Sequence, residues 1–282
     1  MRVMQIFISC SKAGRLLFLV IALFTAGCAS VSDRYEAADR IAAEVGFTKT
    51  FVKTDNFTLT AYTRFDRPLD DLNVYIEGDG SAWLSRTRLS DDPTPRRPLV
   101  LELAARDPAP NVAYLARPGQ YTAAAKPGCH PDYWSDRRFS QEVVASVNQA
   151  LDSLLRQARS DRVNLIGYSG GAAIAVLIAA RRNDVATLRT VAGNLDTEAV
   201  NRHHGVSPLK RSLNPIDAAE KVKNLPQHHF AGSKDTVVPP FIIESFLKRA
   251  GDQDGRRFTI VDGVSHTRGW SERWKSLLAA PF

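Results

Sequence analysis

Short apolar runs alternate along this chain with longer segments whose apolar residues recur at helical spacing. Runs rich in β-branched and aromatic side chains predict strands at 51–54, 57–63, 73–77, 111–115, 162–166, 188–192, 227–231 and 257–261. Longer periodic segments predict helices at 98–105, 139–158, 170–182, 240–250 and 270–278. Strands that alternate with helices indicate an α/β fold, in which helices on both faces cover a mainly parallel central sheet.

The first 27 residues have the pattern of an export signal. Arg2, Lys12 and Arg15 precede the apolar run Leu16–Ala26, which is too short to span a bilayer. The run ends in Thr-Ala-Gly-Cys28, which resembles the bacterial lipobox, although the lipobox has Leu where this chain has Thr. We therefore expect a lipoprotein signal over 1–27 and lipidation of Cys28, with a bacterial-envelope membrane anchor. The alternative is cleavage after Ala29 and a soluble periplasmic protein.

The rest of the chain is expected to form one exported domain. Residues 28–50 predict a helix or tether, and 51–282 predict a single α/β domain with a possible cap at 194–226. If Cys10 leaves with the signal and Cys28 is lipidated or removed, Cys129 alone remains, so no intrachain disulfide can form. The composition, with 44% hydrophobic and 24% charged residues, is that of a globular protein.

The sequence shows neither a pattern for nucleic-acid binding nor one for metal or cofactor binding. The formal net charge is +7, but no basic block of the nucleic-acid-binding kind accompanies it, so we expect no nucleic-acid partner. No metal-ligand cluster and no cofactor motif is visible in the sequence. The expected partner is instead a small-molecule substrate.

The most specific motif is the Gly-x-Ser-x-Gly sequence over 167–171. A predicted strand that ends at residue 166 directly precedes the motif and a predicted helix follows Ser169, which is the strand–turn–helix context of a nucleophile elbow. Such a turn exposes the serine hydroxyl, and the helix N-terminus places partial positive charge beside it. Ser169 is therefore the candidate nucleophile.

From about Phe51 onward the chain resembles the α/β-hydrolase superfamily, in which the serine is followed by an acid and then by a histidine. Of six histidines, only His266 lies beyond the last predicted strand. Asp235, in a Gly-Ser-Lys-Asp loop before Val-Val-Pro-Pro, matches the acid position. Asp196 is the alternative acid, because some members of the superfamily place the acid after the preceding strand.

The resemblance also implies an oxyanion hole formed by two backbone N–H groups. One belongs to Gly170, and the other comes from the loop Glu77-Gly-Asp-Gly-Ser81, with Asp79 the first choice and Gly80 the second. Glu77 stands where the superfamily often has His. A carboxylate near a developing oxyanion is unfavourable, so the Asp79 side chain is expected to point elsewhere.

Three long loops that follow strand ends, at 79–98, 116–138 and 194–226, are expected to build the substrate pocket. Together they hold 13 Lys or Arg against 9 acids, a weak indication of an anionic substrate. The candidate pocket residues are Trp83, Trp134, Tyr168, Asp196 and His204.

These patterns predict a serine hydrolase of the carboxylesterase or lipase type that acts through Ser169, His266 and Asp235. Amide cleavage and acyl transfer to another alcohol stay open as related reactions. The alternative from a different class is a non-catalytic binding or envelope-maintenance lipoprotein on a hydrolase scaffold.

Overall fold

The structure is a computed structural model of the chain, and it describes residues 30–122, 129–252 and 257–282. Residues 1–27 and Cys28, on which the signal and lipidation predictions depend, lie outside these ranges. Within them, no helix combines the length and the apolar character needed to cross a membrane.

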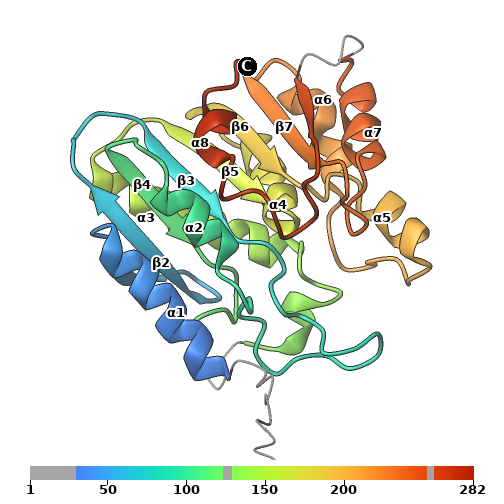
Figure 1. The fold of residues 1–282 in the computed structure, drawn as a ribbon, viewed down its shortest axis with the longest axis horizontal. Helices are drawn as coiled ribbons and strands as arrows, with labels where there is room; N and C mark the ends of the chain where they lie inside the picture. The colour runs from blue at the N-terminus through green and yellow to red at the C-terminus, as the bar shows by residue number, and fades with distance from the viewer. Residues whose placement is uncertain (1–29, 123–128, 253–256) are drawn as a thin grey trace, which may run out of the picture.

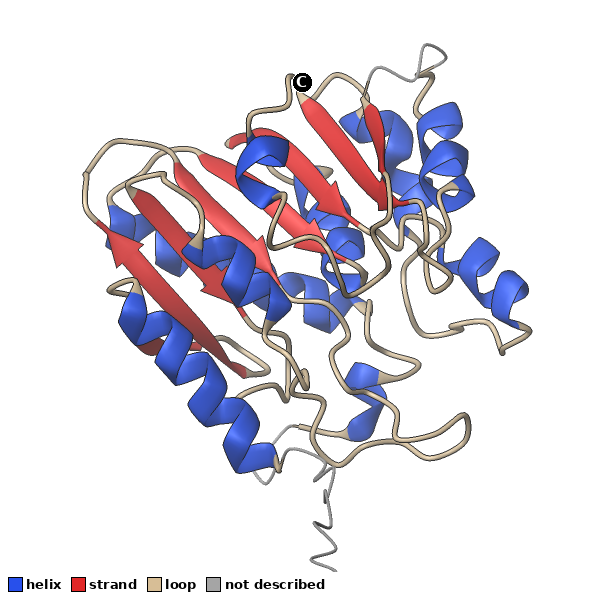
Figure 2. Ribbon diagram, in the orientation of Figure 1, coloured by secondary structure: helices blue, strands red, loops and turns tan. Residues whose placement is uncertain are grey.

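An eight-stranded sheet forms the centre of the protein (Figures 1 and 2). Its order is β1-β2-β4-β3-β5-β6-β7-β8, and all strands are parallel except β2, which pairs antiparallel with both β1 and β4. The strands are β1 Thr48–Lys53, β2 Thr58–Phe65, β3 Leu72–Ile76, β4 Asn111–Leu115, β5 Val163–Tyr168, β6 Val185–Val191, β7 Gln227–Gly232 and β8 Phe258–Val261.

Helices cover both faces of this sheet, as the alternation of strands and helices predicts (Figure 2). The α-helices are α1 Val31–Glu44, α2 Leu99–Ala105, α3 Gln141–Ala158, α4 Gly170–Ala179, α5 Thr197–His204, α6 Ala219–Val222, α7 Phe241–Arg249 and α8 Trp274–Leu278. Two short 3₁₀ helices, η1 Pro131–Trp134 and η2 Pro215–Ala218, lie in the loops. Helix α8 is shorter than the predicted 270–278, because residues 270–273 form turns before it.

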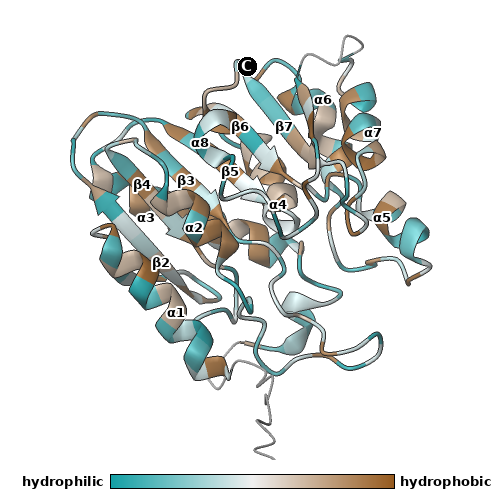
Figure 3. Cartoon of the chain, in the orientation of Figure 1, coloured by the Kyte–Doolittle hydropathy of each residue, from teal (hydrophilic) through white to brown (hydrophobic). Residues whose placement is uncertain are grey.

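The sheet divides the core into two apolar clusters. Alternate residues of each inner strand face opposite sides, so that in β3 Val74 packs with α3 and α4 while Tyr75 packs with α2 and α8. Helix α4 is buried throughout and is almost uniformly hydrophobic in Figure 3. The burial of α4 agrees with its apolar sequence. It also fixes the position of Gly170, the first residue of the helix, which follows Ser169.

Helix α1 is a packed helix of the domain. Ser30 and Asp33 form a capping box at its N-terminus. The Arg34 guanidinium donates to the Thr94 carbonyl at 3.0 Å, and the Tyr35 hydroxyl donates to Asp92 at 2.9 Å. The N-terminal end of α1 therefore lies against the loop that follows β3, at the carboxyl edge of the sheet.

Candidate active site

Ser169 occupies a strained turn between β5 and α4. Its φ of 50° lies in the left-handed region, with ψ at −117°, a conformation that costs free energy for any residue with a side chain. Neighbouring backbone holds it in place: its N–H donates to the Val191 carbonyl at 2.9 Å, and its carbonyl accepts from the Asn194 N–H at 3.0 Å. The turn has the strand–turn–helix geometry that the motif predicts for a nucleophile elbow.

The last glycine of the motif is required by close approach. A β-carbon on Gly171 would lie 2.2 Å from the Ile76 carbonyl oxygen, far inside van der Waals contact. Only glycine therefore lets α4 begin directly against the end of β3. This approach brings the loop after β3 next to Ser169.

His266 lies in the loop after β8 and contacts both other predicted residues. Its Nε2 is 3.1 Å from Ser169 Oγ, and its Nδ1 is 2.8 Å from Asp235 Oδ2. Two donors fix its backbone, because its carbonyl accepts from the Tyr168 hydroxyl at 2.9 Å and from the Trp270 indole at 3.0 Å. With Nδ1–H donating to Asp235, the Nε2 atom is free to accept the Ser169 hydroxyl proton.

Asp235 is buried and fully engaged. Its Oδ1 accepts from the backbone N–H groups of Val237 at 2.9 Å and Val238 at 2.8 Å, which leaves Oδ2 for His266. The alternative acid, Asp196, instead caps helix α5: its Oδ1 accepts from the Ala199 N–H at 3.0 Å. Of the two acids, Asp235 is the one that the structure brings to His266.

Three backbone N–H groups near Ser169 lack an acceptor among the described residues. Gly170 opens α4, so its N–H has no intrahelical acceptor. The Asp79 N–H, in the loop after β3, donates to no other described residue, and the same holds for Gly80. Gly80 has a positive φ of 64° and turns tightly against the Pro93 carbonyl. These groups are available to a developing oxyanion.

The Asp79 carboxylate lies against Gly170, contrary to the expectation that it points elsewhere. A β-carbon on Gly170 would be 2.0 Å from Asp79 Oδ1. Two arginines neutralise this carboxylate: Arg117 Nη1 is 3.5 Å from Oδ1 and Arg138 Nε is 3.2 Å from Oδ2. Desolvation of the buried Arg117 lowers its pKa to about 10, so it stays charged at neutral pH. The sequence did not single out either arginine.

Glu77 anchors the start of the same loop. Its Oε1 accepts from the Gly78 N–H at 2.8 Å and its Oε2 accepts from the Tyr114 hydroxyl at 2.9 Å. Complete burial raises the pKa of Glu77 to about 7. Glu77 stands where the superfamily often has His. Its carboxyl group is bound in the core by the Tyr114 hydroxyl.

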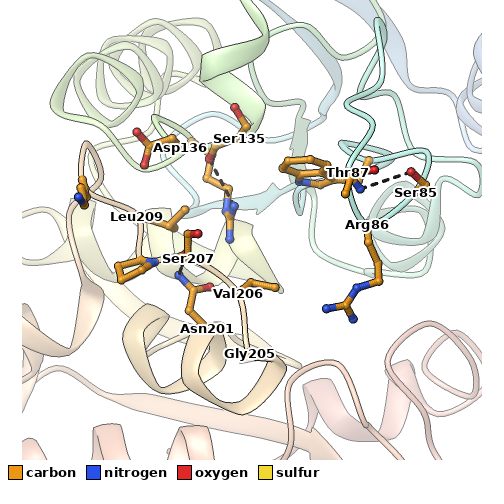
Figure 4. A pocket seen from close by; sticks show the side chains of 14 residues that line it. Ser85, Arg86, Thr87, Ser135, Asp136, Asn201, Gly205, Val206, Ser207 and Leu209 are labelled. Carbon is orange, nitrogen blue, oxygen red and sulfur yellow. Dashed lines mark hydrogen bonds between the residues drawn. The ribbon is translucent and has the colours of Figure 1, made fainter.

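Two hollows open at this edge of the sheet. Ser169 and His266 line a cavity of about 720 Å³, together with Tyr168, Asp79 and Gly80. A larger cleft of about 860 Å³ does not include Ser169, and segments from all three long loops line it (Figure 4). The Asp79–Arg138 ion pair connects the two, because Asp79 lines the first hollow and Arg138 lines the second.

Two of the five predicted pocket residues line a hollow, and three do not. Tyr168 lines the Ser169 cavity and Trp83 lines the larger cleft. Trp134 is 3% exposed and donates its indole N–H to the Ser90 carbonyl, so it forms no wall of either hollow. Asp196 and His204 line neither, and His204 Nε2 contacts the Val237 carbonyl at 2.7 Å.

The predicted cap segment 194–226 contains α5, η2 and α6. Its stretch from 205 to 210 borders the larger cleft. Among the described residues, no group of three or more His, Cys, Asp or Glu side chains is placed to hold a metal ion.

The sequence matches no protein-family model and none of the curated proteins. The structure resembles solved structures over most of its length. Est1E from Butyrivibrio proteoclasticus has a TM-score of 0.59 and 13% identity, covering 82% of this chain and 97% of that one. An esterase from Pyrococcus furiosus has a TM-score of 0.59 and 13% identity, covering 84% and 91%.

Two further similarities are to proteins described as hydrolases. An alpha-beta serine hydrolase homologue from Coxiella burnetii has a TM-score of 0.53 and 15% identity, covering 82% of this chain and 93% of that one. A bacterial membrane phospholipase A has a TM-score of 0.56 and 15% identity, covering 88% and 90%. With the strand order, these similarities show that the chain has the α/β-hydrolase fold.

Proposed function

We propose that this protein is a serine hydrolase that cleaves carboxylic esters through a covalent acyl-enzyme. The observation that carries the proposal is the hydrogen-bond chain from Ser169 through His266 to Asp235, located at a strained elbow beside two unused backbone donors. The esterases among the structural neighbours support an ester as the substrate.

In the first half of the reaction, Ser169 Oγ attacks the ester carbonyl while His266 Nε2 accepts its proton. The carbonyl oxygen becomes an oxyanion, which the N–H groups of Gly170 and Asp79 stabilise. His266 then gives the proton to the leaving alcohol, and the C–O bond to that alcohol breaks. Asp235 holds His266 in the required tautomer and stabilises the imidazolium cation.

In the second half, water replaces the alcohol. His266 Nε2 takes a proton from water, which attacks the acyl-enzyme and forms a second oxyanion in the same position. Return of the proton to Ser169 Oγ releases the carboxylic acid and regenerates the free enzyme. An amide would follow the same steps with an amine as the leaving group, and another alcohol in place of water would give acyl transfer.

The test is turnover of a 4-nitrophenyl ester by wild type and by Ser169→Ala. Loss of the nucleophile is expected to lower kcat by about 10⁴–10⁶-fold while the circular dichroism spectrum stays unchanged. Ser160→Ala is a matched control, because Ser160 lies at the opposite edge of the sheet, where its hydroxyl donates to the Asp70 carbonyl. Equal turnover by wild type and Ser169→Ala contradicts the assignment of Ser169 as the nucleophile, and a wild type without turnover above the uncatalysed rate favours the alternative of a non-catalytic binding lipoprotein.

We further propose that lipidation of Cys28 anchors the protein in a bacterial membrane. One residue, Ala29, separates Cys28 from Ser30, a reach of about 7 Å between their Cα atoms, and Ser30 caps α1 at the edge of the sheet that holds Ser169. An anchor at Cys28 would therefore keep the candidate active site close to the lipid surface.

Cys28→Ser tests the anchor by fractionation of cells and metabolic labelling with a fatty-acid analogue. The wild type is expected in the membrane fraction with label, and the variant without label. Cys129→Ser serves as the control because it removes a cysteine and keeps the lipobox. An unlabelled wild type that begins at Ser30 supports the soluble periplasmic alternative.

A further inference from the structure

Two arginines at the Ser169 cavity have no side-chain partner among the described residues. Arg96 comes from the loop after β3 and Arg268 from the loop after β8, two residues beyond His266. Both side chains are exposed. A third arginine in the lining, Arg97, differs from them because its guanidinium is bound to Glu102 at 2.6 Å.

The carboxylates that line the same cavity are already engaged. Asp79 pairs with Arg117 and Arg138, and Glu77 accepts hydrogen bonds from Tyr114 and a backbone N–H. Neither is free to neutralise an arginine at the mouth. Among the residues that line the cavity, no carboxylate is therefore paired with Arg96 or Arg268.

The larger cleft next to this cavity also has basic side chains without an acidic partner within the described ranges. Arg86 and Lys210 line it without a side-chain partner in the part of the chain that the structure describes. Its one acidic lining residue, Asp136, is bound by Arg211 at 2.7 Å. In Figure 4 the Arg86 side chain extends away from its own loop, while Asp136 lies on the opposite side of the cleft.

We propose that the substrate is an ester that carries a second, anionic group, a carboxylate or a phosphate, which Arg96 and Arg268 bind while Ser169 attacks the ester carbonyl. This inference rests on the proposed ester hydrolysis and adds the chemistry of the substrate. Guanidinium groups suit this role because their planar N–H donors match carboxylate and phosphate oxygens. Arg86 and Lys210 add a field of the same sign, which raises the local concentration of anions.

The test uses the full-length protein and two soluble esters of matched length. 4-Nitrophenyl butyrate is neutral, and the 4-nitrophenyl monoester of succinic acid has a carboxylate in place of the terminal methyl group. The measured quantity is the ratio of kcat/KM for the anionic ester to that for the neutral ester. We expect Arg96→Gln/Arg268→Gln to lower this ratio about tenfold, as two partly exposed charge contacts would.

A matched double variant controls for net charge. Arg162→Gln/Lys223→Gln also removes two positive charges, but these residues precede β5 and β7 and so lie at the opposite edge of the sheet. Its ratio is expected to equal that of the wild type. Sodium chloride should lower the wild-type ratio, because salt screens exposed charges beyond about 8–10 Å.

A second arm separates a soluble anion from an anionic lipid headgroup. Fatty-acid release is measured from vesicles of phosphatidylglycerol and of phosphatidylcholine with identical acyl chains. In either arm, a preference for the anionic substrate that depends on Arg96 and Arg268 supports the inference. The arm that shows this preference identifies the source of the anion. Hydrolysis of neutral and anionic esters at equal efficiency in both arms overturns it and leaves the proposed hydrolase intact. Absence of hydrolysis in both arms refutes the hydrolase and the inference together.

Discussion

Replacing Gly170 by alanine should disable the oxyanion hole without touching the proposed nucleophile. The new β-carbon would lie 2.0 Å from Asp79 Oδ1 and 2.6 Å from Asp79 Cγ, against a normal contact of 3.4 Å or more. The helix start cannot retreat, because it is buried against β3, and the carboxylate is held by Arg117 and Arg138. The strain should therefore displace the Asp79 loop and its N–H.

The expected cost follows from the loss of one backbone donor. Removal of a single oxyanion-hole donor lowers kcat by about 10²–10³-fold, or about 3–4 kcal/mol of transition-state stabilisation. The assay is turnover of 4-nitrophenyl butyrate, with thermal unfolding to verify that the variant is folded. The fall is expected mainly in kcat, since the donor acts on the transition state.

A double-variant cycle checks the assigned cause. Asp79→Gly removes the side chain that the new methyl group meets, so Gly170→Ala should cost much less in the Asp79→Gly background than in the wild type. Equal costs in both backgrounds, or a folded Gly170→Ala enzyme with kcat within threefold of the wild type, would refute the proposed role of this contact.

Three further predictions concern other parts of the site. Asp235→Asn should lower kcat about 10⁴-fold, because an amide stabilises the wrong tautomer of His266; a loss below tenfold in ester turnover contradicts this role. Glu77 has its pKa raised from 4.5 to about 7, so the folded protein binds more protons between these values. The free energy of unfolding should therefore fall by about 3 kcal/mol as pH rises through that window, and urea unfolding at pH 5 and pH 8 should show no such fall for Glu77→Gln. Trp134→Phe should lower the free energy of unfolding by about 1–3 kcal/mol through the lost hydrogen bond to Ser90, with kcat/KM unchanged; a change in ester preference without a loss of stability would identify it as a pocket residue.

The layered fold was predictable because its buried strands and helices carry strong hydrophobic patterns. Every predicted strand is present in the sheet, and strand order places the loops that hold Ser169, Asp235 and His266 at one edge. Element ends were less predictable. The helix predicted from Trp270 begins at Trp274, and a bend and turns occupy residues 270–273 before it.

Side-chain positions in the long loops could not be predicted from the sequence. An aromatic residue in a loop can face a cleft or the interior. Trp83 lines the larger cleft, whereas Trp134 is buried. On grounds of charge, the sequence predicts that the Asp79 carboxylate points away from a developing oxyanion. It packs beside Gly170 because two arginines, distant in sequence, neutralise it, and no sequence pattern marks such a cluster.

Covalent labelling determines whether Ser169 is an activated nucleophile. The full-length protein is treated with a fluorophosphonate, and mass spectrometry locates the adduct. We expect one phosphonylated residue, Ser169, with labelling greatly slowed by His266→Ala. A protein that hydrolyses esters but carries the adduct on another serine, or carries none, contradicts the assignment of Ser169 as the nucleophile.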